Sequence, residues 1–295
     1  MKILVIGLDG ASPETLLDDE GLETIQSLRD VGCYGRLECT SPPDSSPLWT
    51  CLPSSIADSN ALQARTIWDQ TAEAGGESIL VGLPAKTPLG PVKGVSVGDF
   101  LDLAAAGKPS AHPADVAATI EKLAGAESLA SADDRSNDAD PLEASRKQFA
   151  VVRHLAANAP WDYFQLVDSG MARIGRDAGG PSAEVARNYL LHLDREIANA
   201  LEVLTEDALV LIASVDPAGQ GAFILAGSQL PPLGAIEGVR LIDVAPTLLE
   251  LTGRPPLPDA QGRNFLAGRE VEGADPSDLD DELVRERLRG LGYIG

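Results

Sequence analysis

The stretch KILVIGLDG (residues 2–10) decides the fold, because it joins an apolar run directly to a charged side chain. The run is short, continuous and ended by Gly10, which is typical of a strand buried on both faces of a parallel sheet. Asp9 comes directly after this run, and open α/β sheets gather their ligand chemistry at that end of a strand. Asp9 therefore has two interpretations: a carboxylate that holds a cation, or a side chain that caps the turn at Gly10.

Short apolar runs alternate with segments of helical spacing along the rest of the chain. Strands are predicted at residues 2–8, 78–83, 94–100, 163–167, 209–214 and 222–227. Helices are predicted at residues 13–18, 21–31, 61–75, 114–123, 141–158, 181–204, 241–253 and 282–292. This alternation predicts an α/β protein, a three-layer α/β/α sandwich with a mainly parallel central sheet. No repeat or strong linker interrupts it, so we expect a single domain over residues 1–295.

The composition is strongly acidic and limits the classes of partner. The chain has 45 Asp and Glu against 23 Lys and Arg, a formal net charge of −22. Such a surface excludes nucleic-acid backbones and anionic membranes as partners. It also resembles the surfaces of proteins from salt-adapted cells, where dissolved ions screen the self-repulsion.

Three cysteines and short apolar runs indicate the compartment. Cys33, Cys39 and Cys51 form no CxxC pair, so we expect neither a disulfide framework nor a structural zinc site. The first apolar run is too short for the core of a signal peptide, and no stretch approaches the length of a membrane span. A cytoplasmic protein is therefore the expectation.

A second motif, CTSPPDSSPLWTCLPS (39–54), packs prolines around two serines and a tryptophan. Prolines would fix a loop here, and a hydroxyl at its tip could act as a nucleophile beside a metal ion. Together with the first strand, this segment resembles the type I phosphodiesterase/nucleotide pyrophosphatase family of the alkaline phosphatase superfamily. Members of that family begin with a strand ending in Asp-Gly, followed by a loop of the form P-P-x-[ST]-x-P-x-W-T. PPDSSPLWT (42–50) matches that form, which places the nucleophile position at Ser45.

The resemblance covers most of the chain and implies an alkaline-phosphatase-like fold. RTIWD (65–69), LIDVAPTLLELTG (241–253) and RLRGLGYI (287–294) are similar to non-catalytic segments of the family. In relatives, the segment before the middle helices can form a cap over the site. Here we expect only a short remnant of that cap at about residues 101–140.

The resemblance also implies two metal ions, usually zinc, held by three Asp and three His. Asp9 is the first of these ligands. The next two should come as D-R-I-Q-H, but this chain reads ARIGR (172–176), so that Ala172 and Arg176 stand at the ligand positions. We interpret Arg176 as a fixed guanidinium in place of a cation, able to pair with Asp9 or with an anionic ligand.

The remaining metal ligands of the family are also replaced. Where the family has S-D-H-G, this chain reads SVDP (214–217), with Val215 and Asp216 at the two ligand positions. The sixth ligand, a histidine before the strand at 222–227, has no counterpart in PAGQG (217–221).

Other side chains of the chain offer weak substitutes for these ligands. Asp216 and Asp168 follow predicted strands and could hold Mg²⁺ together with Asp9. None of the three histidines, His112, His154 and His192, follows a strand. His192 is predicted on a solvent-facing stripe, and all three are interpreted as structural.

The sequence therefore favours a pseudoenzyme that has kept the fold of a hydrolase for binding or regulation, with no metal cofactor. Without a metal, Ser45 lacks the activation that its chemistry requires. Two alternatives stay open. One is an active metal-dependent phosphodiesterase or phosphatase that uses Ser45 with an altered metal site, and the other is a structural partner of an active relative. A protein partner or a second copy of the chain is the expected binding partner.

Overall fold

The computed structural model describes residues 1–39, 45–57, 61, 63–83, 92–100, 111–124, 140–177, 183–204 and 207–269. For residues 45–48, 115, 121, 124, 175–177 and 183 it describes the backbone alone. The predicted helix at residues 282–292 lies outside this part of the chain. In the part that is described, no helix combines the length and the apolar character that crossing a membrane would need.

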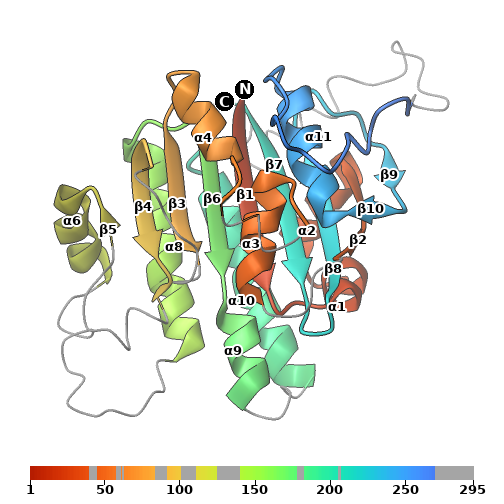
Figure 1. Cartoon of the computed structure of the whole chain (residues 1–295). Coiled ribbons are helices and arrows are strands. Elements are labelled where there is room, and N and C mark those ends of the chain that lie inside the picture. Colours follow the sequence, from red (N-terminus) through yellow and green to blue (C-terminus); the bar gives the residue numbers. More distant parts are fainter. Residues whose placement is uncertain are drawn as a thin grey trace.

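One ten-stranded sheet runs through the molecule (Figure 1), in the order β10-β2-β8-β7-β1-β6-β3-β4-β5, with β9 also paired to β2. The strands are β1 (Lys2–Asp9), β2 (Cys33–Glu38), β3 (Ser78–Leu83), β4 (Gly94–Gly98), β5 (Ala111–His112), β6 (Tyr163–Asp168), β7 (Ala208–Val215), β8 (Gln220–Ala226), β9 (Gly234–Ala235) and β10 (Val239–Arg240). Only β5 and β8 pair in antiparallel fashion with their neighbours. The predicted mainly parallel sheet is confirmed.

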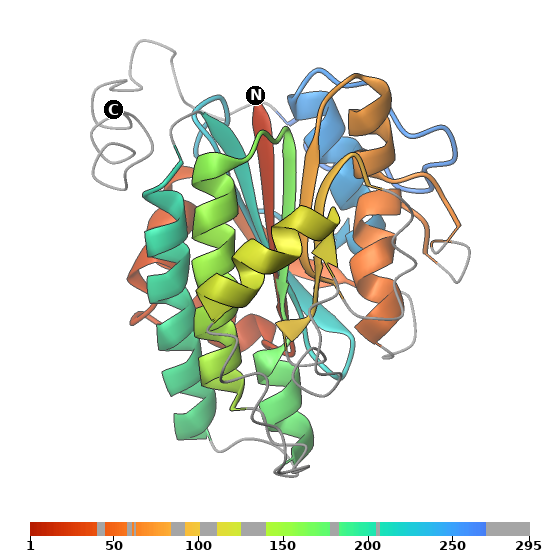
Figure 2. The ribbon, with the colours of Figure 1, turned by 90° about the vertical axis from the view of Figure 1, so that its left-hand side faces the viewer.

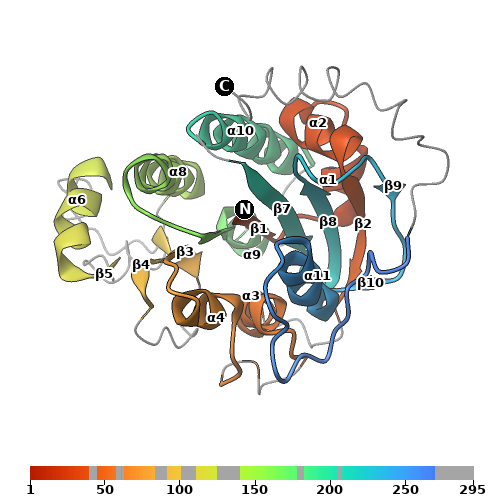
Figure 3. The same cartoon turned by 90° about the horizontal axis from the view of Figure 1, so that it is seen from above.

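Helices cover both faces of this sheet, as Figures 2 and 3 show. One face carries α1 (Pro13–Asp18), α2 (Glu23–Val31), α6 (Ala114–Ala124), α8 (Pro141–Asn158) and α10 (Ala183–Leu201). The other face carries α3 (Ser45–Ser54), α4 (Ile67–Glu73), the short 3-10 helix η2 (Leu241–Asp243) and α11 (Val244–Leu251). A further helix, α9 (Gly170–Asp177), follows β6 and lies at the end of the sheet to which β1 and β6 point (Figure 1). The predicted α/β/α sandwich is therefore confirmed.

The segment predicted as a cap remnant is described in part. Of residues 101–140, the structure describes 111–124 and Asp140, and it places β5 and α6 at one outer edge of the sheet (Figure 1). The single domain over residues 1–295 stays a prediction.

Several elements depart from the sequence-based expectation. Helix α9 and the short strands β5, β9 and β10 were not predicted, and the helix predicted over residues 61–75 is the shorter α4. A loop was predicted over residues 39–54, but α3 occupies Ser45–Ser54. The prolines misled the prediction because Pro47 falls in the first turn of the helix, where no N–H is needed, and Pro53 falls in its last turn. Strand β2 was not predicted, since Gly35 and Arg36 interrupt its few apolar residues, although its buried and exposed positions alternate in the structure.

Strand β1 divides the core into two clusters, because its side chains alternate between the faces of the sheet. Leu4, Ile6 and Leu8 pack with α8 and α10. Ile3 and Val5 pack on the opposite face with α3 and α11. The alternation assigns Gly7 and Asp9 to the α3 face.

Gly7 allows α3 to pack closely against the sheet. A Cβ atom at this position would lie 2.4 Å from the ring of Trp49, so only a glycine lets the indole approach the strand this closely. Trp49 is fully buried. The contact fixes the helix that begins with Ser45 against the central strand.

The substitution Gly7→Ala tests this contact. We expect it to lower the free energy of unfolding by about 1–3 kcal/mol, because the new methyl group overpacks the core at Trp49. Chemical denaturation followed by circular dichroism measures the change. Gly21→Ala is the matched control, since its Cβ would meet only side-chain atoms, those of Arg187, Asp19 and Leu191. Equal stability of Gly7→Ala and wild type would contradict the packing argument.

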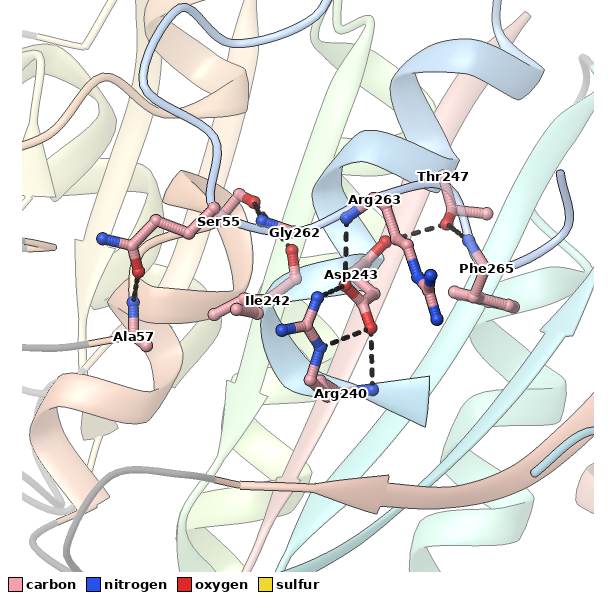
Figure 4. Close-up of polar contacts among 10 residues, drawn as sticks. Ser55, Ala57, Arg240, Ile242, Asp243, Thr247, Gly262, Arg263 and Phe265 are labelled. Carbon is pink, nitrogen blue, oxygen red and sulfur yellow. Dashed lines mark hydrogen bonds and ion pairs between the residues drawn. The ribbon is translucent and has the colours of Figure 1, made fainter. Parts of the chain in front are cut away.

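The far end of α3 is tied to the C-terminal segment of the described chain (Figure 4). Ser55 has a positive φ of 60° and is fully buried. Its hydroxyl donates to the carbonyl of Ile242 at 2.7 Å and accepts from the N–H of Gly262 at 3.0 Å. The side chain of Gln261 accepts from the N–H of Ala57 at 3.0 Å. These bonds hold a backbone conformation that a serine rarely adopts.

Asp243 joins the same segment to the start of α11 (Figure 4). Its two carboxylate oxygens accept from the guanidinium of Arg240 at 2.7 and 3.0 Å, and Oδ1 also accepts from the N–H of Arg263 at 2.9 Å. Burial opposes ionisation, but these hydrogen bonds hold the pKa of Asp243 below its ordinary value. Asp243 is thus a charged anchor for the strap of residues 254–269.

Replacement of this anchor by Asp243→Ala should lower the free energy of unfolding by about 2–4 kcal/mol, because it leaves buried N–H groups and a guanidinium without their acceptor. Urea denaturation at neutral pH measures it. Asp207→Ala, which removes an acceptor of the exposed Ser228 hydroxyl, is the control and should cost less than about 0.5 kcal/mol. Equal decreases in the free energy of unfolding of the two variants would contradict the role of Asp243 as an anchor.

Candidate functional site

Asp9 ends β1 at the centre of the sheet and is 5% exposed. In the parallel pairing of β1 with β7, Asp9 stands directly beside Val215. The N–H of Gly10 donates to the carbonyl of Val215 at 2.8 Å, which fixes this register at the strand ends. The ligand position that the family resemblance assigned to Val215 is therefore adjacent to Asp9. It carries a buried isopropyl group that belongs to the apolar core of the α3 face.

The next ligand position, Ala172 in α9, also lies near the end of β1. Gly10 has a φ of +93°, and a Cβ there would lie 2.5 Å from the backbone nitrogen of Ala172. The backbone of α9 thus lies against the turn that follows Asp9. The structure brings the predicted ligand positions together, but the side chain that α9 offers at 172 is a methyl group.

Asp216 follows Val215 and is engaged in its own turn. Its Oδ1 accepts from the N–H groups of Ala218 at 2.9 Å and Gln220 at 2.8 Å. Gly219, with a φ of +78°, completes the turn between β7 and β8. One carboxylate oxygen is therefore committed to holding the hairpin.

Asp168 lies on the other side of the sheet. It pairs in register with Leu8, whose side chain packs on the α8 and α10 face. Its Oδ1 accepts from the hydroxyl of Tyr189 at 2.9 Å and from the N–H of Gly170 at 3.1 Å. Since Asp9 belongs to the α3 face, the sheet separates the two carboxylates, and the structure does not bring them together for a shared ion.

Ser45 and Arg176 are placed by their backbone alone. Ser45 is the first residue of α3, and Arg176 lies in the last turn of α9. Strands β2 and β7 both run antiparallel to β8, so they point the same way. The chain consequently leaves β2 toward Ser45 at the edge of the sheet where Asp9 lies. Contact between Asp9, Ser45 and Arg176 stays a prediction.

Cys39 is a neighbour of this edge that the sequence did not indicate. Burial above all, together with the nearby groups Asp216 and Cys51, raises the pKa of its thiol to about 12. The thiol is therefore neutral at physiological pH, and a neutral thiol is a poor nucleophile and a poor metal ligand.

None of the three histidines belongs to the Asp9 end of the α3 face. His112 lies in the edge strand β5, and His154 and His192 lie in α8 and α10 on the opposite face. The expected solvent-facing position of His192 is wrong: the residue is 6% exposed, and its Nε2 lies 3.2 Å from the hydroxyl of Ser145. Charged neighbours along α10 suggested exposure, but α8 covers this side chain.

These residues do not fit a pair of zinc ions. In the described ranges, no three His, Cys, Asp or Glu side chains are grouped so that they could hold a metal ion. The donor set at the end of β1 is Asp9 beside a valine and an alanine, whereas zinc sites take several nitrogen, sulfur or oxygen ligands.

Comparisons with known proteins agree on the fold. No protein-family model and no curated protein sequence matches the chain. Among solved structures, the phosphonate monoester hydrolase of Silicibacter pomeroyi has a TM-score of 0.58 at 14% identity, over 94% of this chain and 78% of that one. Human ectonucleotide pyrophosphatase/phosphodiesterase 5 has a TM-score of 0.56 at 9% identity, over 88% and 96%. A protein in the alkaline phosphatase superfamily from Vibrio parahaemolyticus has a TM-score of 0.50 at 13% identity, over 91% and 70%.

The chain has the fold of the alkaline phosphatase superfamily. The fold that the sequence resemblance implied is thereby confirmed. Structural matches at such low sequence identity show the fold alone. What the site can do chemically has to be judged from its residues.

Introducing the ligands that the family resemblance calls for tests the geometry of the site. The combined variant Ala172→Asp, Arg176→His, Val215→Asp and Asp216→His should gain about one tightly held zinc per chain, because positions 172 and 215 lie beside the end of β1 and the resemblance assigns 176 and 216 to the same site. Metal analysis after dialysis measures the bound zinc, with wild type as the reference. Adding Asp9→Asn to the variant is the control and should abolish the gain. Equal zinc in wild type and the four-residue variant would contradict the placement of these positions.

Proposed function

We propose that this protein is a non-catalytic member of the alkaline phosphatase superfamily, of the type I phosphodiesterase/nucleotide pyrophosphatase type, which acts by binding. The observation that carries the proposal is the register of β1 and β7. It sets Val215 beside Asp9, where the family resemblance calls for a metal ligand.

The chemistry of the superfamily explains why this replacement matters. Bound metal ions would activate the hydroxyl at the Ser45 position and stabilise charge on the phosphoryl group. Val215 and Ala172 supply no ligand atoms from their side chains, and Asp216 has one carboxylate oxygen bound to its own turn. Ser45 would then keep the reactivity of an ordinary alcohol.

Arg176 suggests what the site binds instead. It stands four residues after Ala172 in the same helix, so both positions share a face of α9. Since Ala172 lies against the turn after Asp9, a guanidinium at position 176 could pair with Asp9 or receive an anionic group. A binding role through a protein partner or a second copy of the chain, in the cytoplasm, completes the proposal.

The structural neighbours support an alternative function. The phosphonate monoester hydrolase is named as a hydrolase, and its fold covers 94% of this chain. An active metal-dependent phosphodiesterase or phosphatase, working through Ser45 with an altered metal site, is therefore the competing proposal.

An assay with a generic aryl phosphodiester separates the two proposals. With Zn²⁺, Mn²⁺ or Mg²⁺ added, we expect the wild-type rate to equal that of Ser45→Ala, because a serine hydroxyl that no metal ion activates keeps the reactivity of an ordinary alcohol. Release of the aryl alcohol measures the rate, and thermal melting of both proteins checks that the substitution leaves the fold intact. Metal-dependent turnover that disappears in Ser45→Ala would establish the active hydrolase instead.

A further inference from the structure

Helix α3 contains a proline, Pro53, in its last turn. In an α-helix the N–H of each residue donates to the carbonyl four residues before it, and a proline has no N–H. The carbonyl that would accept from residue 53 is that of Trp49. Since Trp49 is fully buried, bulk water does not reach this carbonyl, and another part of the protein has to supply the missing donor.

Strand β6 supplies that donor from the sheet. Nε2 of Gln165 donates to the carbonyl of Trp49 at 3.3 Å. Gln165 is fully buried and pairs in register with Val5, whose side chain packs on the α3 face. An unpaired amide or carbonyl in such a place is costly, so this one bond satisfies two buried groups.

Tyr163, two residues earlier in β6, orients the amide of Gln165. Its hydroxyl donates to Oε1 of Gln165 at 2.6 Å. Burial raises the pKa of this hydroxyl above its ordinary value, so it keeps its proton and remains a donor. Because the carbonyl of Trp49 can only accept, the NH₂ group of the amide faces the helix and its oxygen faces Tyr163.

Two strands therefore hold the same residue of α3. Gly7 of β1 accommodates the indole of Trp49, and Gln165 of β6 bonds its carbonyl. Ser45, the first residue of α3, stands four residues before Trp49, which is about one helical turn. The backbone position of Ser45 consequently follows from how Trp49 is held.

We propose that Gln165 is a positioning residue for α3: its amide replaces, from β6, the hydrogen bond that Pro53 removes from the helix, and so holds the turn that begins with Ser45. Tyr163 supports this role by orienting the amide. The role goes beyond the proposed function and does not depend on it, because α3 has to be held in place in a binding protein and in a hydrolase alike.

Restoring the missing N–H tests this role. In Pro53→Ala, residue 53 can donate to the carbonyl of Trp49 within the helix, and Gln165 is no longer needed there. Urea denaturation of wild type, Gln165→Met, Pro53→Ala and the double variant gives a double-mutant cycle. We expect the fold-loss in the folding equilibrium constant caused by Gln165→Met to be about tenfold smaller in the Pro53→Ala background. Tyr163 loses its acceptor in both backgrounds, so that contribution cancels.

A second buried glutamine provides the matched control. Gln148 of α8 is 3% exposed, and its Nε2 donates to the carbonyl of Val167 at 2.8 Å. Gln148→Met therefore removes a bond of the same kind, but α8 lies on the face of the sheet opposite to α3. Its effect on the folding equilibrium constant should be the same with proline or alanine at position 53.

The carbonyl of Trp49 also reports the bond directly by nuclear magnetic resonance. Trp49-Thr50 is the only Trp-Thr pair in the sequence, so carbonyl-¹³C tryptophan combined with ¹⁵N threonine labels this peptide bond alone. Loss of the donor in Gln165→Met should move the ¹³C resonance to lower frequency. The double variant should return it toward the wild-type position, and Gln148→Met should leave it unchanged.

The rescue by Pro53→Ala decides the outcome. If Gln165→Met alone fails to fold, folding of the double variant is the expected rescue. Equal losses of stability in the two backgrounds, a carbonyl resonance that does not move in Gln165→Met, or failure of both the single and the double variant to fold would overturn the proposal. Each of these results would show that the amide does not stand in for the missing N–H.

Discussion

The parallel pairing of β1 with a strand on each side is the constraint on which the rest of the molecule depends. Strand β1 is bonded to β6 and β7 over nearly its whole length and is buried on both faces. Since its side chains alternate, the register alone determines what stands beside Asp9 and on which face. A slip of one residue would exchange the two faces and put Leu8 where the carboxylate now stands.

The sheet consequently separates two polar sites that the sequence places close together. Asp9 and Asp168 both end central strands, yet they belong to opposite faces, each with its own helices. On one face, Asp9 stands beside Val215, and the turn that follows it lies against the backbone of Ala172. On the other, Asp168 is bound into a chain of hydroxyl groups and an imidazole. Helix α9 touches both sites, through Ala172 on one side and Gly170 on the other.

Much of the fold could be predicted from the sequence, because long apolar runs and helix caps are local signals. The helix after Asp140 begins and ends as expected, with Asp140 accepting from the N–H of Leu142 at 3.0 Å. Pro246 lies in the first turn of α11, where a proline is tolerated. The family motifs led to the correct fold, and two of the positions that they assigned to ligands, 172 and 215, lie beside the end of β1.

The features that escaped prediction depend on contacts between distant segments. His192 has charged neighbours along its helix, and only the approach of α8 shows that it is buried. The face on which Asp168 lies follows from strand register, which no local pattern reveals. The buried chain of Ser145, Tyr189 and His192 was missed for the same reason.

The position of Trp49 has a consequence for how such proteins are recognised. The indole of the Trp-Thr pair is retained here because it fills the space above Gly7, and this requirement persists whether or not the neighbouring serine reacts. A sequence motif that combines packing residues with reactive ones can therefore be present in a protein whether or not that protein is active. The presence of Trp49 therefore indicates that α3 packs on the central strand. Whether a protein with this fold catalyses a reaction has to be judged from the residues beside Asp9.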